Sequence, residues 1–141
     1  LENTSLSIIL GGGPEDGNRA KLIKRDLNTD RIILATQFKL KINCGLIKQS
    51  KILISPDSGP MHIGFALKVP TVAMFWSINA NQDIRNKFNG PDYCGPLDIN
   101  SELYSILSGS FKDIKQDEKL GNSYSNLITV ENVWDKVKQH L

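Results

Sequence analysis

The sequence has few cysteines and no long apolar segment. Of its 141 residues only two are cysteine, Cys44 and Cys94, and they form no CxxC pair that could hold zinc or run dithiol chemistry. We expect two free thiols in a reducing cytoplasm. No apolar run approaches the roughly 20 residues that span a bilayer, and the segment LENTSLSIIL at the N-terminus lacks the basic region and cleavage site of a signal peptide. The chain is therefore expected to be neither secreted nor membrane-spanning.

The chain also lacks an excess of one charge. Its formal net charge is +2 and its lysines are dispersed, so no nucleic-acid partner is expected, although an anionic small molecule is compatible with this balance. Hydrophobic residues make up 40% and charged residues 23%, which are ordinary values for a globular protein. Together with the length, they predict a single packed domain over residues 1–141.

What the sequence does contain is a repeated alternation of apolar runs and helical spacing. Three apolar segments are each followed by apolar residues at helical spacing: 7–10 then 18–27, 32–35 then 40–47, and 52–55 then 60–67. A fourth strand is expected at 71–75. Wholly apolar strands joined by helices indicate an α/β fold with a Rossmann-like, doubly wound parallel sheet.

The pattern is lost between residues 77 and 126, which are rich in Asn, Asp, Gly, Pro and Ser. Within this region only 103–107 resembles an ordered apolar element. A last helix is predicted after Thr129, which is a plausible N-cap. Its apolar face is formed by Val130, Val133, Trp134, Val137 and Leu141.

Ligands of open parallel sheets bind beyond the carboxyl ends of the strands, so the loops that follow the strands are the candidates for a site. The first of these loops, GGGPEDGNR, nearly matches two phosphate motifs and satisfies neither. Asp16 stands where the dinucleotide fingerprint needs its third glycine, and Asn18 and Arg19 stand where a P-loop needs Lys and Ser or Thr. The loop is either a turn whose glycines adopt positive φ or a loop that closes over a ligand.

The third loop, in ISPDSGPMHIGFALKVP, carries more specific residues. Asp57 or Ser58 can cap the helix that follows, and Pro60 suits its first turn because a missing N–H costs nothing there. Gly59 allows a ligand to approach the backbone. The turn is therefore built like a ligand-binding connection between strand and helix.

The backbone amides of this turn suggest an anion site. The amides near Gly59, Met61 and His62 are expected to face outward at the positive end of the helix dipole, which favours an anion by roughly 0.3–1 kcal/mol. His62 stands one turn into an otherwise apolar helix and can donate a hydrogen bond to a phosphate oxygen. The alternative is a capped, buried helix in which His62 is bonded to a backbone carbonyl.

The stretch ISPDSGPMHIGFALKVPTVAMFW resembles the signature of glycosyltransferase family 9, the bacterial lipopolysaccharide heptosyltransferases. That signature has an Asp-Ser/Thr-Gly-x-x-His-x-Ala pattern after a strand and then a Val-Pro-Thr-Val strand. Upstream ILGGGPEDGNRAKLI and C-terminal ITVENVWDKVKQHL are similar to other parts of the family, so the resemblance covers residues 6–78 and 127–141. Two positions depart from it: Gly64 replaces the usual alanine, and 76–78 replace a Gly-Pro-Thr turn.

The resemblance implies a GT-B fold of which this chain is the C-terminal, nucleotide-sugar-binding half. It implies that the N-terminal acceptor domain and its catalytic base are absent, so that no catalytic residue lies in this chain. The donor, such as ADP-heptose, would have its pyrophosphate held by the turn and its sugar beside it. The implied donor-binding residues are Asp57, Ser58, Gly59, Pro60, Met61 and His62.

The resemblance also implies a donor loop and a reaction class. The donor loop would be formed by Gly12, Gly13, Glu15 and Trp76, of which Trp76 is either a stacking residue or a core residue. The reaction would be an inverting glycosyl transfer in lipopolysaccharide core synthesis without cofactor or metal, and the chain has no DxD triplet. The full-length enzyme would use a glycolipid or saccharide acceptor in the cytoplasm, at most peripheral to the inner face of the inner membrane.

Three other interpretations remain. The chain could belong to a GT-B-type UDP-sugar transferase or epimerase, which can also carry an Asp-Ser-Gly turn, but His62 favours the heptosyltransferase type. It could be a non-catalytic α/β module that binds a nucleotide or nothing. A flavodoxin-like signalling domain would need an acidic cluster that Glu15 and Asp16 supply only loosely.

Overall fold

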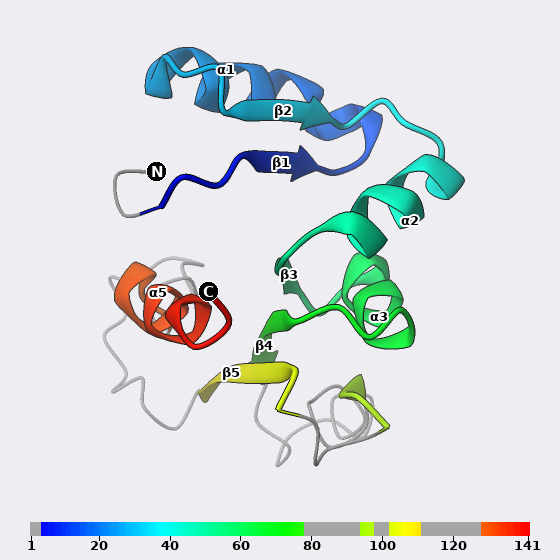
Figure 1. Cartoon of the computed structure of the whole chain (residues 1–141), viewed down its shortest axis with the longest axis vertical. Helices are drawn as coiled ribbons and strands as arrows, with labels where there is room; N and C mark the ends of the chain where they lie inside the picture. The colour runs from blue at the N-terminus through cyan, green and yellow to red at the C-terminus, as the bar shows by residue number, and fades with distance from the viewer. Residues whose placement is uncertain (1–3, 78–93, 98–101, 111–127) are drawn as a thin grey trace, which may run out of the picture. The chain divides into compact units, whose positions relative to one another are not determined.

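The computed structural model describes residues 4–77, 94–97, 102–110 and 128–141 (Figure 1). Contacts divide the chain into two compact units, residues 1–46 and 47–141. The prediction for most of residues 77–126 falls outside the described residues. Among the described residues, no helix is long and apolar enough to cross a membrane.

Residues 1–46 contain a parallel two-stranded sheet. Strand β1 (Ile8–Gly11) pairs with β2 (Ile32–Ala35), and Ile8 stands opposite Ile32. Between them lie a 3₁₀ turn η1 (Pro14–Asp16) and helix α1 (Gly17–Leu27), which packs on β2. A helical crossover of this kind is how two parallel strands are joined. Helix α2 (Leu40–Gln49) follows and continues into the second unit, uninterrupted by Gly45.

Residues 47–141 contain a parallel three-stranded sheet in the order β3–β4–β5. Its elements are β3 (Leu53–Pro56), α3 (Gly59–Ala66), β4 (Thr71–Ser77), β5 (Tyr104–Ser110) and α5 (Val130–Lys138). Helix α3 packs against β3 and β4, and α5 packs against β4 and β5. The predicted parallel α/β architecture is confirmed, and the 103–107 segment is part of a strand.

Helices α3 and α5 lie on opposite faces of this sheet (Figure 1). Alternate residues of a strand point to opposite faces. Ala73 and Phe75 form a buried cluster with Met61 of α3. Ser105, by contrast, is hydrogen-bonded to His140 at the end of the chain, 2.9 Å from Nε2, beyond α5. The sheet is therefore covered on both sides, as a doubly wound fold requires.

Helix α5 begins after Thr129, the N-cap that the sequence predicts, and the cap is reciprocal. Thr129 Oγ1 accepts a hydrogen bond from the Asn132 amide at 3.2 Å, and Asn132 Oδ1 accepts one from the Thr129 amide at 3.1 Å. The carboxyl group of Glu131 accepts hydrogen bonds from its own backbone amide and from the Thr129 side chain, which hold its pKa below the usual value. These bonds fix the first turn of a helix whose Val137 is buried against the sheet.

We expect Thr129→Ala to lower the free energy of unfolding by about 1 kcal/mol, because it leaves an N-terminal amide of α5 without its acceptor. Val130→Ala is the matched control. The Val130 side chain is 80% exposed and makes no cap, so its loss should change stability by less than about 0.5 kcal/mol. Urea denaturation followed by circular dichroism measures both. Equal effects of the two substitutions would show that the cap contributes nothing.

Candidate functional site

The turn between β3 and α3 is held to the sheet by its backbone. The Asp57 amide donates to the Met74 carbonyl of β4 at 3.0 Å. Ser58 occupies the N-cap position in an extended conformation, but no side chain caps α3. Its Oγ donates instead to the Pro56 carbonyl at 3.1 Å and lies 3.2 Å from Ser55 Oγ. The predicted side-chain cap is therefore wrong, because the end of β3 offers the Ser58 hydroxyl a carbonyl acceptor.

Fewer backbone amides of this turn are free to bind a ligand than the sequence predicts. The Met61 and His62 amides, which were expected to face a ligand, donate to the Ser58 carbonyl at 3.0 and 3.5 Å. They are engaged because Met61 makes an i→i−3 bond and His62 makes the first i→i−4 bond of the helix, both to the carbonyl of the N-cap residue. Within the described residues, the amides of Ser58 and Gly59 donate no hydrogen bond. Two donors, rather than the larger set expected from the sequence, are thus available at the positive end of the helix.

Gly59 leaves space above these amides. A Cβ placed on Gly59 would meet no atom within 4 Å. Pro60 follows in the first turn, as predicted, and contributes no N–H. Met61 is fully buried and anchors the helix beneath the turn. The backbone at Gly59 is therefore accessible to an anionic group that needs close approach.

Gly64, the departure from the family pattern, has a packing explanation. A Cβ at this position would lie 2.6 Å from Leu53 Cδ2 and 2.9 Å from Thr71 Oγ1. Thr71 is fully buried and its hydroxyl donates to the Val69 carbonyl at 2.8 Å, so it is not free to rotate away. Glycine is the residue that lets α3 approach the sheet this closely.

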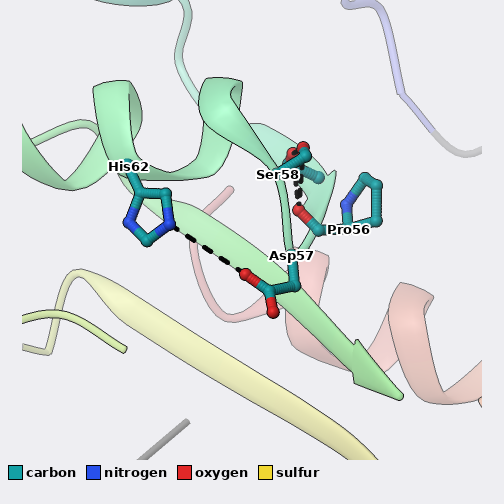
Figure 2. Close-up of polar contacts among 5 residues, drawn as sticks. Pro56, Asp57, Ser58 and His62 are labelled. Carbon is teal, nitrogen blue, oxygen red and sulfur yellow. Dashed lines mark hydrogen bonds and ion pairs between the residues drawn. The ribbon is translucent and has the colours of Figure 1, made fainter. Parts of the chain in front are cut away.

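Asp57 and His62 meet across the mouth of the turn (Figure 2). Asp57 Oδ1 and His62 Nε2 are 4.0 Å apart, and their side chains are 33% and 54% exposed. Within the described part of the chain, the imidazole makes no hydrogen bond to a backbone carbonyl, which was the alternative to a ligand-facing histidine. A cationic or neutral imidazole held beside a carboxylate can donate a hydrogen bond to a bound anion.

The glycine-rich loop of residues 1–46 is constrained by its acidic side chains. Asp16 Oδ2 accepts a hydrogen bond from the Gly13 amide at 3.0 Å. A Cβ on Gly12 would lie 2.9 Å from Asp16 Cβ, and one on Gly13 would lie 2.3 Å from a Glu15 carboxylate oxygen. No glycine in the described ranges has positive φ, so the proposed reason for these glycines is wrong. At Gly12 a side chain is excluded by Asp16 Cβ, whereas the Glu15 carboxylate beside Gly13 stands at the end of a flexible side chain that can move aside.

A hollow of about 190 Å³ lies beside this loop, between α1 and the carboxyl ends of β1 and β2. Its polar lining comes from Asp16, Arg19 and Thr36. Arg19 and Thr36 were not among the predicted site residues. The signal was available, because Thr36 directly follows β2 and ligands bind at that end of a parallel sheet.

The predicted site residues fall in both units. The structure brings Asp57, Ser58, Gly59 and His62 together at one turn. Gly12, Gly13 and Glu15 belong to residues 1–46, and the side chain of Trp76 is outside the described residues. Their grouping with the turn into one donor site stays a prediction.

The parallel α/β architecture and the turn at the carboxyl end of β3 define a Rossmann-like half of a GT-B fold. Three solved structures share this fold. The ADP-heptose lipopolysaccharide heptosyltransferase II of E. coli matches with a TM-score of 0.66 and 23% identity over 95% of this chain and 36% of its own. E. coli heptosyltransferase WaaC with ADP matches with a TM-score of 0.66 and 17% identity over 96% of this chain and 34% of its own. A family 9 glycosyl transferase from Veillonella parvula DSM 2008 matches with a TM-score of 0.68 and 24% identity over 95% of this chain and 36% of its own.

The sequence comparison identifies the family. The family model of glycosyltransferase family 9 (heptosyltransferase) matches residues 1–82, and the chain belongs to this family. Lipopolysaccharide heptosyltransferase 2 of Salmonella typhimurium and of Escherichia coli K12 are each 26% identical over 142 residues, which is 97% of this chain. The chain spans 38% of the length of these relatives. The resemblance inferred from the DSGPMH turn is confirmed.

Proposed function

We propose that residues 1–141 form the nucleotide-sugar-binding domain of an inverting, metal-independent heptosyltransferase, with a donor such as ADP-heptose. Membership of family 9 supports a sugar-transfer function. The choice of ADP is supported by solved neighbours described as an ADP-heptose enzyme and as a heptosyltransferase with ADP. The choice of lipopolysaccharide core synthesis is supported by the names of the curated relatives.

The observation that carries the proposal is the pair of backbone amides at the N-terminus of α3 that donate no hydrogen bond within the described residues. Ser58 and Gly59 have amides without an acceptor among the described residues, and nothing within 4 Å covers Gly59. A pyrophosphate needs several N–H donors and a backbone without a Cβ in the way, and a helix N-terminus adds a favourable dipole. We therefore assign the donor pyrophosphate to this turn.

Asp57 and His62 have complementary roles in this proposal. His62 donates a hydrogen bond to a phosphate oxygen, and its partner Asp57 holds the imidazole at the edge of the turn. Donors fixed in this way stabilise the negative charge that develops on the departing nucleoside diphosphate. We assign no residue of this chain as the base that deprotonates the acceptor hydroxyl of a glycolipid or saccharide. We place the reaction in the cytoplasm, at most peripheral to the inner membrane, as nucleotide-sugar chemistry suggests.

Calorimetric titration with ADP, UDP and GDP, without and with magnesium, tests the proposal. We expect metal-independent binding with ADP preferred, and we expect His62→Ala to weaken it about tenfold because a charge-assisted hydrogen bond is lost. His140→Ala is the matched control. The His140 imidazole is bonded to Ser105 on the opposite face of the sheet, and its loss should leave affinity within about twofold.

The other outcomes of this titration discriminate between the remaining interpretations. A preference for UDP would reassign the chain to a UDP-sugar enzyme of GT-B type. Absence of binding by a chain that circular dichroism shows to be folded would contradict the proposal and favour a non-catalytic module. A requirement for magnesium would contradict the metal-independent mechanism.

A further inference from the structure

We propose that Tyr104 of β5 is a positioning residue for His62 and acts through Phe65. The inference rests on the proposed function, since it concerns how the imidazole of the donor site is held. It depends on contacts within residues 47–141 alone. Tyr104 does not border the turn in sequence and belongs to a strand that begins 42 residues after His62.

A line of rings connects the two residues. His62 and Phe65 lie three positions apart in α3, and side chains at this spacing share a helix face. Their ring centroids are 6.4 Å apart at an interplanar angle of 84°. The rings of Phe65 and Tyr104 are 4.8 Å apart at 66°, which is also an edge-to-face contact. Such contacts fix the relative orientation of rings as well as their distance.

Tyr104 also holds the backbone of α3. Its hydroxyl donates to the Phe65 carbonyl at 3.0 Å in the last turn of the helix, and the same carbonyl also accepts a hydrogen bond from the Lys68 amide at 3.1 Å. Tyr104 itself is fixed in the sheet, because it stands opposite Thr71 in the β4–β5 register. The helix that carries His62 is therefore tied to β5 by a ring contact and by a hydrogen bond.

The two halves of the Asp57–His62 pair are thus anchored to different strands of one sheet. Asp57 is held by its amide to Met74 of β4, and His62 is held through Phe65 to Tyr104 of β5. His62 is 54% exposed, so few other contacts restrict its ring. Loss of the Tyr104 ring should let Phe65 move and release the imidazole from its place opposite Asp57.

A double-mutant cycle separates this role from a general loss of stability. We expect Tyr104→Leu to weaken ADP binding threefold to tenfold, roughly the energy of an aromatic pair, in the parent chain. In a His62→Ala background it should change affinity by less than about twofold, because the residue through which it acts is gone. Equal losses in both backgrounds, or no loss in the parent, would overturn the proposal.

Two further variants control for packing and for the hydroxyl. Ile106→Ala removes a β5 side chain that, like Phe65, packs on the Met61–Ala73–Phe75 cluster, and it should leave ADP affinity within about twofold. A loss equal to that of Tyr104→Leu would mean that any damage to this core acts on the site, against the proposal. Tyr104→Phe keeps the ring and should retain most of the affinity. A loss as large as that of Tyr104→Leu would contradict transmission through the ring.

A measurement without nucleotide keeps this inference separate from the proposed function. In the free chain, nuclear Overhauser contacts between the His62 and Phe65 rings should be present, lost in Tyr104→Leu and kept in Ile106→Ala. If these contacts persist in Tyr104→Leu, the positioning role is wrong. If they are lost but the parent chain binds no ADP, the positioning role stands and it is the proposed function that fails.

Discussion

Gly59→Val is expected to abolish ADP binding and leave the chain folded. The site of the substitution is open on the protein side, since a Cβ there would meet nothing within 4 Å. The same space is where the proposed pyrophosphate approaches the Ser58 and Gly59 amides. A branched side chain would hold it beyond hydrogen-bonding distance, and loss of two charge-assisted hydrogen bonds corresponds to a decrease of more than about a hundredfold.

The size of the substituent and a second glycine make this prediction specific. Gly59→Ala should give an intermediate loss of about tenfold, because a single methyl group obstructs the approach only in part. Gly45→Val is the control, since a Cβ on Gly45 in α2 also meets no atom within 4 Å. It should leave affinity unchanged. Calorimetry gives the affinities and thermal unfolding checks the fold; a Gly59→Val chain that binds ADP as the parent does would exclude this turn.

Gly64→Ala is expected to lower the free energy of unfolding by about 1–2 kcal/mol, although alanine is the better helix former. The intrinsic preference would favour alanine by up to about 1 kcal/mol. The Leu53 methyl group that the new Cβ meets can rotate away. Thr71 Oγ1 is fixed by its hydrogen bond to Val69, so the helix must move instead and disturb the packing of α3 on the sheet.

Gly45→Ala isolates the helix-propensity term in the same chain. With no neighbouring atom in the way, this substitution should stabilise the protein by up to about 1 kcal/mol. Urea denaturation should therefore shift the two midpoints in opposite directions. A gain of stability in both variants would show that the contact of α3 with Thr71 is not tight and that Gly64 has another origin.

Much of the fold could be predicted from the sequence because apolar periodicity reports burial directly. The strand at 32–35 was predicted with its observed bounds, and α1 and α3 were placed within one residue at each end. For strand β5 the sequence predicted only an apolar segment at 103–107. The strand extends through Ser108, Gly109 and Ser110, which are not apolar, because these residues also pair with β4. Periodicity identifies a strand but does not say which strand it pairs with. The division of the strands into two sheets, β1–β2 and β3–β4–β5, was therefore not predicted.

The sequence indicates which residues form the turn between β3 and α3 but not the hydrogen bonds that they make. The family signature indicates Asp57, Gly59 and His62 because each has a distinct side chain or backbone requirement. What the sequence could not show is which hydrogen-bond partner a short hydroxyl side chain takes. The Ser58 hydroxyl could accept from an amide of α3 or donate to a carbonyl of β3. It donates to the Pro56 carbonyl, because the end of β3 places that carbonyl beside it. The contact of Tyr104 with Phe65 could not be predicted either, because it depends on the register of the sheet.

The most direct test of the central claim is an amide-resolved ADP titration of the isotope-labelled chain. The claim is that the N-terminus of α3 holds the pyrophosphate of the donor through the Ser58 and Gly59 amides. These two resonances should show the largest shifts on adding ADP, should shift similarly with inorganic pyrophosphate at higher concentration, and should stay in place with adenosine. Saturable binding that leaves both amides unshifted while other residues respond would contradict the account.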